Sequence, residues 1–263
     1  MPDPILLRED QGPITSLTMN RPTALNALSD ALLAALSADL ASLAATPSCR
    51  VIILKGAGKA FCAGHDLKEM QAGRAAPDQG RGYFADLFAR CAALMLAIRA
   101  QPQPVIAEVH GIATAAGCQL VASCDLALAA SGTRFGVNGV NIGLFCSTPM
   151  VALSRNIATK RAFEMLTTGH FISTEAAEQA GLINRAVAPE RLAAETLTMA
   201  QTIAAKLGAA VKIGKRAFYD QLDMPIAEAY AHTAAVMVEN MLWRDTEEGI
   251  NAFLEKRKPD WPT

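Results

Sequence analysis

Short apolar runs alternate with longer segments of helical periodicity along most of the chain. The apolar runs predict buried strands at 5–8, 13–19, Val51–Leu54, Val105–Val109 and Leu126–Ala129. A turn at Asp10–Pro13 is expected between the first two strands. From Pro189 onward only helical periodicity remains. This order predicts an α/β fold, with a core over residues 1–188 and a helical C-terminal region over residues 189–263.

The predicted helices have recognisable ends. Leucines recur at helical spacing after Ser29, whose hydroxyl suits a helix N-cap. Thr174 is expected to cap a later helix, and Gly181 to end it. The segment 71–82 is rich in glycine and polar residues and predicts a mobile lid over a site. The other predicted helices are Phe84–Ala100, Val151–Ile157, Arg161–Leu166, Thr174–Ala180, 190–207, 209–222, 226–242 and 245–256.

Two segments share the order of an apolar strand, a turn of small residues and a helix start. The first runs from Val51 to Met70 and turns at Ala63 and Gly64. The second runs from Pro104 to Asp125 and turns at 113–117. Small residues let the backbone approach a ligand, and the first N–H groups of a helix have no partner within it. Such turns suit a developing oxyanion, and the alternative is a packed turn without a ligand.

Composition and charge argue against several classes of function. Lys and Arg number 24 against 25 for Asp and Glu, and no basic block indicates a nucleic-acid partner. No apolar stretch suggests a membrane span, and the first residues lack the pattern of a signal peptide. The 6 cysteines lack CxxC spacing and the 4 histidines are scattered, so we expect buried thiols in a cytoplasmic protein and no metal site. Gly56–Lys59 lacks the spacing of a phosphate loop, which argues against nucleotide binding.

Four stretches together resemble one known family. FCAGHDLKEM (Phe61–Met70) and VHGIATAAGCQLVASCD (Val109–Asp125) resemble the two signatures of the enoyl-CoA hydratase/isomerase, or crotonase, superfamily. Asn20–Leu28 and Phe253–Pro259 are similar to its N-terminal loop and its C-terminal helix end. The resemblance implies a spiral of ββα units and a helical C-terminal region used to form a homotrimer or hexamer. It also implies an acyl-CoA thioester as ligand, so that CoA is part of the substrate and no separate cofactor is expected.

The resemblance also implies the roles of particular residues. The backbone N–H groups of His65 and Ala116 would form an oxyanion hole. Thr23 stands where the family often has a basic residue that helps to bind CoA. Lys256 matches a lysine that can reach the CoA of a neighbouring subunit. The full set of implied CoA-binding positions is Ala24, Ala63, Gly64, Asp66, Leu67 and Lys256.

The chain departs from the family at its acid–base groups. The two glutamates that hold the water in a family hydratase correspond here to Gln119 and Gly139. No Asp or Glu occurs between Asp125 and Glu164, so a shifted alignment supplies no second carboxylate. A positioned acid or base contributes ~10²–10⁴-fold to a rate. We therefore expect a poor hydratase, and expect carboxylates restored at both positions to revive it.

Three other side chains are candidates for chemistry. Cys146 lies where some members of the superfamily place alternative catalytic groups, and the other reading is a buried core thiol. The side chain of His65, if exposed beside the carbonyl, would titrate near neutral pH, whereas its family role uses the backbone alone. Asp66 is expected to cap the short helix that follows it.

These features leave several functions open. The first is an enzyme of enoyl-CoA hydratase/isomerase type acting on an acyl-CoA. A decarboxylase fits the missing glutamates, because the enolate then forms by loss of CO₂ and needs only the oxyanion hole. A thioesterase is a further alternative. The last is a non-catalytic acyl-CoA-binding protein that kept the pocket and lost the chemistry.

Overall fold

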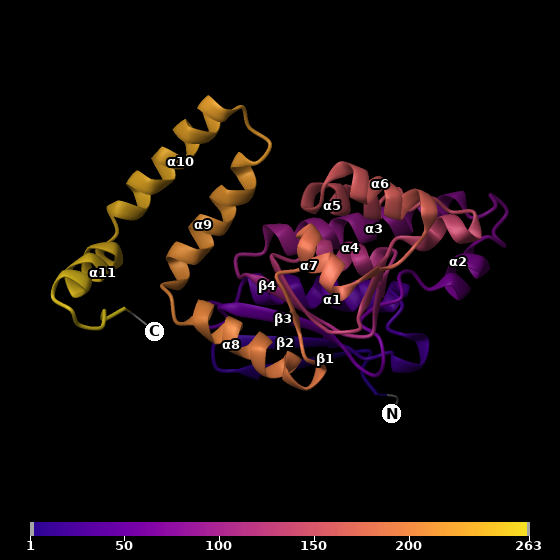
Figure 1. Cartoon of the computed structure of the whole chain (residues 1–263), viewed down its shortest axis with the longest axis horizontal. Coiled ribbons are helices and arrows are strands. Elements are labelled where there is room, and N and C mark those ends of the chain that lie inside the picture. Colours follow the sequence, from indigo (N-terminus) through magenta and orange to yellow (C-terminus); the bar gives the residue numbers. More distant parts are fainter. Residues whose placement is uncertain (1–2, 262–263) are drawn as a thin grey trace.

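The computed structural model describes residues 3–261 and is built around a mainly parallel sheet (Figure 1). Six strands within these residues lie in the order β1 (Leu6–Gln11), β2 (Ile14–Met19), β3 (Val51–Gly56), β4 (Val105–Val109), β6 (Leu126–Ala130) and β9 (Arg185–Val187). β1 and β2 are antiparallel, and the other neighbours are parallel. The predicted strands are confirmed. The turn is shorter than predicted, because Asp10 and Gln11 still pair with Thr15 and Ile14.

A second, smaller sheet was not predicted from the sequence. β5 (Ile112–Thr114) pairs in parallel with β7 (Arg134–Gly136), and β7 pairs antiparallel with β8 (Ile172–Ser173). These strands are two or three residues long, too short to show a strand period. The small sheet matters for function because β5 leads directly into α4 (Ala116–Ser123).

Helices bury both faces of the main sheet. Ile52 and Leu54 of β3 join the core on one side, and Val51 and Ile53 join the core on the other. α1 (Asp30–Ala44), α3 (Arg81–Ala100) and α4 contribute to the first core. α8 (Leu192–Ala204) packs across β3, β4 and β6 on the opposite face. α8 therefore covers the sheet although the sequence places it in the helical C-terminal region, and the division at residue 188 stays a prediction.

The helix ends follow local chemistry. Ser29 caps α1, since its hydroxyl accepts the N–H of Leu32 at 3.2 Å, as predicted. The prediction for Thr174 was wrong: the hydroxyl of Ser173 caps α7 (Thr174–Ala180) by accepting the N–H of Ala176 at 3.2 Å. Thr174 is fully buried and its hydroxyl donates to the carbonyl of Thr133 at 2.9 Å instead. The other helices over this part are α2 (Leu67–Gly73), α5 (Pro149–Asn156) and α6 (Thr159–Thr168), with 3₁₀ turns η1 (Pro22–Ala24), η2 (Asn138–Ile142) and η3 (Pro189–Arg191).

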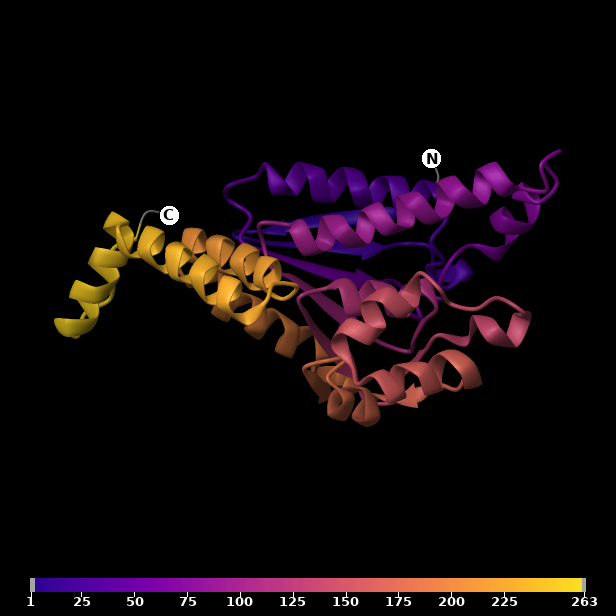
Figure 2. The same cartoon turned by 90° about the horizontal axis from the view of Figure 1, so that it is seen from above.

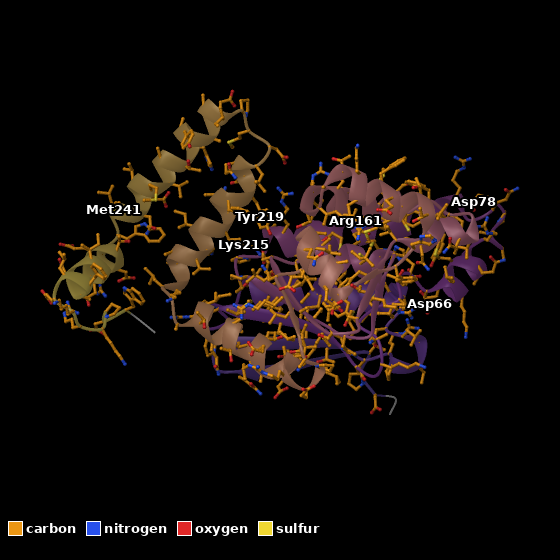
Figure 3. The ribbon with its side chains drawn as sticks, viewed as in Figure 1. Asp66, Asp78, Arg161, Lys215, Tyr219 and Met241 are labelled. Carbon is orange, nitrogen blue, oxygen red and sulfur yellow. The ribbon has the colours of Figure 1, made fainter. Side chains whose placement is uncertain are left out.

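The segment predicted as a lid is divided between elements. It spans the end of α2, a tight turn and the start of α3. The turn is closed by Asp78 (labelled in Figure 3), whose carboxylate accepts the N–H groups of Gly80 at 3.0 Å and Gly82 at 2.8 Å. Its mobility stays a prediction.

The last three helices extend away from the sheet (Figures 1 and 2). α9 (Gly208–Gln221) and α10 (Ile226–Met241) form an antiparallel pair, and α11 (Arg244–Leu254) follows α10. A largely buried ion pair attaches α9 to the core: Lys215 Nζ lies 2.7 Å from Asp125 Oδ2. The hydroxyl of Tyr219 donates to Asp125 Oδ1 at 2.8 Å. Asp125 follows α4 and also accepts the N–H of Val105 at 2.6 Å, so the contact joins the extension to the central strands.

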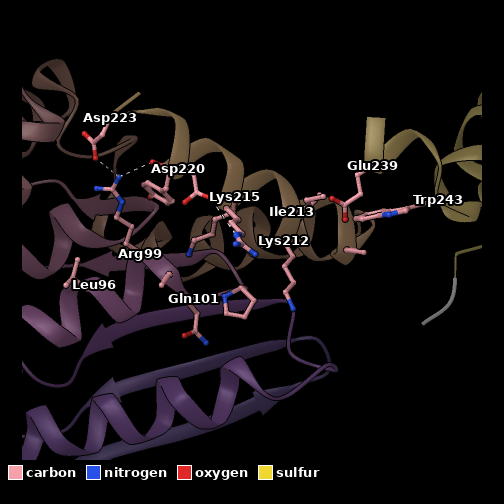
Figure 4. A pocket seen from close by; sticks show the side chains of 15 residues that line it. Leu96, Arg99, Gln101, Lys212, Ile213, Lys215, Asp220, Asp223, Glu239 and Trp243 are labelled. Atoms are coloured by element: carbon pink, nitrogen blue, oxygen red, sulfur yellow. Dashed lines mark hydrogen bonds and ion pairs between the residues drawn. The ribbon is translucent and has the colours of Figure 1, made fainter. Parts of the chain in front are cut away.

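Apolar side chains are left uncovered on this extension. Met237, Leu242 and Phe253 are exposed by 62%, 80% and 82%. A cavity of about 910 Å³ lies between the end of α3 and the extension, lined by Arg99, Lys212 and Trp243 among others (Figure 4). Exposed apolar surface of this kind typically marks an interaction surface.

All six cysteines are buried free thiols, as predicted. Burial raises the pKa of Cys91 to about 11 and the pKa values of Cys62 and Cys118 to about 12. No helix in residues 3–261 has both the length and the apolar character needed to cross a bilayer. Over the same residues, no group of three or more His, Cys, Asp or Glu side chains is arranged to hold a metal ion.

Candidate functional site

The two turns singled out in the sequence lie against each other. The N–H of Thr114 donates to the carbonyl of Cys62 at 3.0 Å, and the N–H of Cys62 donates to the carbonyl of Ile112 at 3.1 Å. Gly117 allows this approach, because a Cβ at that position would overlap the carbonyl oxygen of Cys62. A Cβ on Gly64 would lie 3.5 Å from the amide nitrogen of Ala116. The two predicted donor turns therefore lie in direct contact and form a single candidate site.

The first turn leaves the backbone N–H of His65 without a partner in the described part of the chain. The N–H of Ala63 donates to the carbonyl of Leu25 at 3.0 Å, and the N–H of Asp66 donates to the carbonyl of Leu28 at 3.2 Å. In return the carbonyl of Gly64 accepts the N–H of Leu28 at 2.7 Å. Within residues 3–261, the N–H of His65 has no hydrogen-bond acceptor. The N-terminal loop thus binds the residues on both sides of that donor and leaves the donor itself available.

The second turn holds its donor at a strained position. Ala116 is the first residue of α4, and its N–H has no acceptor in the described part of the chain. The preceding residue, Ala115, has φ +50° and ψ −120°, a conformation that a residue with a Cβ rarely adopts. Such strain costs of order 1–3 kcal/mol and clusters at functional sites. The sequence signal was only a run of small residues, and it did not single out Ala115.

An ion pair between distant residues supports the first turn. Arg21 Nη2 lies 2.8 Å from Asp66 Oδ2, and Arg21 Nη1 donates to the carbonyl of Ala27 at 2.5 Å. Asp66 caps α2 as predicted, because its Oδ1 accepts the N–H of Lys68 at 3.0 Å. Burial opposes the charge on Asp66, but the hydrogen bonds from Arg21 and from the α2 amides outweigh it and lower the pKa of Asp66. No local sequence pattern indicates the role of Arg21, because its partner lies 45 residues away along the chain.

The fully buried Asn26 has a similar supporting role. Its backbone adopts φ +53°. Its side-chain amide donates to the carbonyls of Ala57 at 2.8 Å and Ala60 at 2.7 Å, and its Oδ1 accepts the N–H of Arg21 at 2.9 Å. Asn26 therefore holds the N-terminal loop onto the strand end that precedes the first turn.

The side chain of His65 is largely buried, which corrects the expectation of an exposed imidazole. Its ring packs edge-on against Phe88, with ring centroids 5.7 Å apart. Neither ring nitrogen has a hydrogen-bond partner in residues 3–261. Burial lowers the pKa of His65 below its ordinary value of 6.5. The imidazole is thus neutral at pH 7, and the backbone N–H is the group offered to a ligand.

This burial predicts a pH-dependent loss of stability. Because the pKa is lower in the folded state, the unfolded chain takes up the proton first as the pH falls below 6.5. The unfolding free energy should then decrease by up to ~1.4 kcal/mol per pH unit until the folded value is reached. Urea titrations on both sides of pH ~6.5 should show this loss in the wild type and not in His65→Gln. The exposed His170→Gln is the control, and equal pH dependence in the wild type and His65→Gln would contradict the prediction.

The two positions at which the resemblance implies carboxylates in a hydratase have different surroundings. Gln119 lies on α4, is 5% exposed, and has a buried Oε1 without a partner among the described residues. Gly139 lies in η2, where a Cβ would overlap the carbonyl oxygen of Leu144 and lie 2.9 Å from the Sγ of Cys146. The filled space argues against a glutamate at Gly139, and the revival of a hydratase by carboxylates at both positions stays a prediction. Cys146 itself is 5% exposed and burial raises its pKa, which favours the reading as a core thiol.

The implied CoA-binding positions fall into two groups. Those of the N-terminal loop and the first turn lie together: Ala24, Ala63, Gly64, Asp66 and Leu67, with Leu67 exposed by 55% at the start of α2. Lys256 lies just after α11. Figure 1 shows α11 at the far end of the extension from the sheet. Within one chain the structure does not bring Lys256 to the site.

The model of the enoyl-CoA hydratase/isomerase family matches residues 9–263. The chain belongs to this family. It is 45% identical over 260 residues to the human protein named enoyl-CoA hydratase domain-containing protein 3, mitochondrial, covering 99% of this chain and 84% of that protein. A probable enoyl-CoA hydratase from Rhizobium meliloti is 34% identical and is covered over 97% of both chains.

Solved structures of the family have the same fold. An enoyl-CoA hydratase from Mycobacterium smegmatis superposes with a TM-score of 0.95 at 55% identity, over 99% of this chain and 100% of that chain. Human enoyl-CoA hydratase domain-containing protein 3 gives a TM-score of 0.94 at 44% identity, over 98% and 100%. The predicted α/β crotonase fold is thereby confirmed. The human relative is described as mitochondrial, and nothing in these relatives supports the expected cytoplasmic location.

Proposed function

We propose that this member of the enoyl-CoA hydratase/isomerase family binds an acyl-CoA thioester at the paired turns. The observation that carries the proposal is the pair of unpartnered backbone N–H groups, on His65 and Ala116, held where Gly64 lets a ligand approach. Two fixed donors suit a thioester oxygen that gains negative charge as an enolate forms. CoA is part of the substrate, so the proposal includes no separate cofactor.

Membership of the family supports a lyase- or isomerase-type enzyme. The residues at the two expected acid–base positions then limit which reactions it can catalyse. The amide of Gln119 donates and accepts hydrogen bonds but does not take a proton at neutral pH. Gly139 has no side chain and no room for one. We propose hydration as a weak activity at most.

Decarboxylation of an acyl-CoA with a carboxylate on Cα is the second candidate, favoured by the closed surroundings of Gly139. The bond between Cα and the carboxylate breaks, CO₂ leaves, and its electron pair forms the thioester enolate. Water then protonates Cα, so no side-chain base is required. A thioesterase and a non-catalytic acyl-CoA-binding protein remain further alternatives.

Calorimetry tests the binding step. Titration with CoA, acetyl-CoA and butanoyl-CoA should give saturable heats, with the thioesters binding more tightly than CoA because only they present a carbonyl to the two donors. A mass-spectrometric screen of products from a panel of acyl-CoAs then identifies the reaction. Absence of binding by every thioester at millimolar concentration would refute the proposed function.

We also propose a homotrimer or hexamer built through the extension. The exposed apolar residues of α10 and α11 need a cover that their own core does not provide. In such an assembly Lys256 would reach the CoA of a neighbouring subunit. Light scattering should therefore give three or six times the 27.8 kDa of the chain, and a monomer mass would contradict this expectation.

A further inference from the structure

A side-chain hydrogen bond joins the second turn to η2. The hydroxyl of Thr114 donates to Oδ1 of Asn138 at 2.5 Å, although the two residues lie 24 positions apart along the chain. Thr114 ends β5 and is 7% exposed, and Asn138 begins η2. A hydrogen bond is stronger where water is excluded, so this contact fixes the end of β5.

The strained residue Ala115 follows Thr114 directly. Its φ of +50° and ψ of −120° are rarely adopted by a residue with a Cβ, and glycine is the usual residue in such a conformation. A strained conformation persists only where the surrounding contacts over-determine the backbone. Contacts around Ala115 must therefore hold it, because an alanine that is free to relax returns to an ordinary conformation.

The backbone contacts of Ala115 involve the same two segments as the side-chain bond. The N–H of Ala115 donates to the carbonyl of Gly136 at 2.9 Å, and its carbonyl accepts the N–H of Gln119 at 3.0 Å. Gly136 is the partner of Thr114 in the pairing of β5 with β7, and Asn138 lies two residues further along the chain. The bond from Thr114 to Asn138 therefore reinforces the pairing from which Ala115 is held.

The conformation of Ala115 decides where the second donor points. The N–H of Ala116 belongs to the peptide group that follows Ala115, so a change of ψ at Ala115 rotates this N–H about the chain. A relaxed Ala115 would turn the donor away from its present direction. The proposed site needs both donors, on His65 and Ala116, to be fixed before the thioester oxygen gains charge.

We propose that Thr114 and Asn138 are positioning residues, whose hydrogen bond holds Ala115 in its strained conformation and thereby directs the N–H of Ala116 at the thioester oxygen. The inference rests on the proposed function, because it names the contact that makes the second donor effective. Both side chains act through Ala115 and not on the substrate.

Calorimetry with two matched ligands measures the donors separately from the rest of CoA. Acetyl-CoA has the carbonyl group, and its thioether analogue S-ethyl-CoA has a CH₂ group in the same place. The ratio of their affinities therefore reports the hydrogen bonds to the carbonyl oxygen. The wild type should bind acetyl-CoA ~10-fold more tightly than the thioether, which corresponds to one or two net hydrogen bonds.

Substitutions at each end of the bond should change this ratio. Thr114→Val keeps the shape of the side chain, removes the hydroxyl and should lower the ratio ~5-fold, the scale of one net hydrogen bond. Thr114→Ser keeps the hydroxyl and should retain the ratio. At the other end, Asn138→Leu removes the acceptor and should reproduce the loss, whereas Asn138→Asp keeps an acceptor and should not.

A double-mutant cycle with Ala115→Gly tests whether the bond acts through the strain. Glycine adopts a positive φ at little cost, so it does not depend on Thr114 for support. In the Ala115→Gly background, Thr114→Val should therefore change the affinity ratio less than ~2-fold. A hydroxyl that acts independently of the strain would cause the same loss in both backgrounds.

Thr196→Val is the matched control. Thr196 is fully buried on α8, which covers the opposite face of the main sheet, and its hydroxyl donates to the carbonyl of Leu192 at 2.9 Å. The substitution removes a buried and paired hydroxyl, as Thr114→Val does, but far from the paired turns. It should leave the affinity ratio unchanged.

The possible outcomes separate the two proposals. An unchanged ratio in Thr114→Val and Asn138→Leu would overturn the inference and leave the proposed function intact. An equal loss from Thr114→Val with and without Ala115→Gly would also overturn it, because the bond would then not act through the strain. Equal binding of acetyl-CoA and S-ethyl-CoA by the wild type would remove the role of the donors and both proposals with it. If neither ligand binds, the proposed function itself fails.

Discussion

Gly64→Val is expected to fold and to lose acyl-CoA binding by ~10²-fold, because forcing extra atoms between the two turns costs up to about 3 kcal/mol. Gly64 has φ +92°, and a Cβ there would lie 3.0 Å from the Cβ of Ala115 and 3.2 Å from the carbonyl oxygen of Thr114. A branched side chain would push the two turns apart and fill the approach to both donors. Circular dichroism and calorimetry with acetyl-CoA measure the two parts of the prediction.

Gly132→Val is a suitable control for this substitution. Gly132 has φ +85°, so valine suffers the same backbone strain, but nothing lies within 4 Å of its Cβ position. The control should lose stability and keep its affinity for acetyl-CoA. Unchanged affinity in Gly64→Val would show that the thioester binds elsewhere.

The second large effect concerns hydration. Wild-type protein should hydrate crotonyl-CoA weakly or not at all, and Gln119→Glu should raise the rate by ~10²-fold, the lower end for one positioned acid or base. Position 119 is 5% exposed, and burial raises the pKa of a carboxyl group toward the range useful for a general base. The loss of absorbance of the enoyl thioester at saturating substrate measures the rate.

Two further variants test the reason for that gain. Gln119→Met has a similar size and no proton acceptor, so it should show no gain. Gly139→Glu should lower stability by displacing Leu144 and Cys146, and should add nothing to Gln119→Glu. Rapid hydration by the wild type would contradict the prediction and would show that another group supplies the base.

The main sheet and the paired turns could be predicted from the sequence, but the contacts that hold the turns in place could not. Apolar runs and small residues are local signals, so β3, β4 and the turns at Gly64 and 113–117 could be predicted. The strain at Ala115 was not predictable, because it arises where β5, only three residues long, joins α4. A positive φ normally predicts glycine, and this position holds alanine, so the residue type gave no sign of the strain.

Contacts between distant residues explain the other errors. The pairing of Arg21 with Asp66 and the burial of His65 against Phe88 depend on how loops and helices pack together, which no local pattern encodes. Likewise, Gly139 reads as a missing glutamate in the sequence. Only the approach of Leu144 and Cys146 shows that no side chain fits at that position.

The burial of all six cysteines makes the chain easy to label. Thiol reagents attack the thiolate, which is scarce at neutral pH when burial raises the pKa of Cys62 and Cys118 to about 12. A cysteine introduced at an exposed position of α10, such as Glu239→Cys, would react far faster than the native thiols. A single fluorophore attached there would allow subunit association to be measured without removing the natural cysteines.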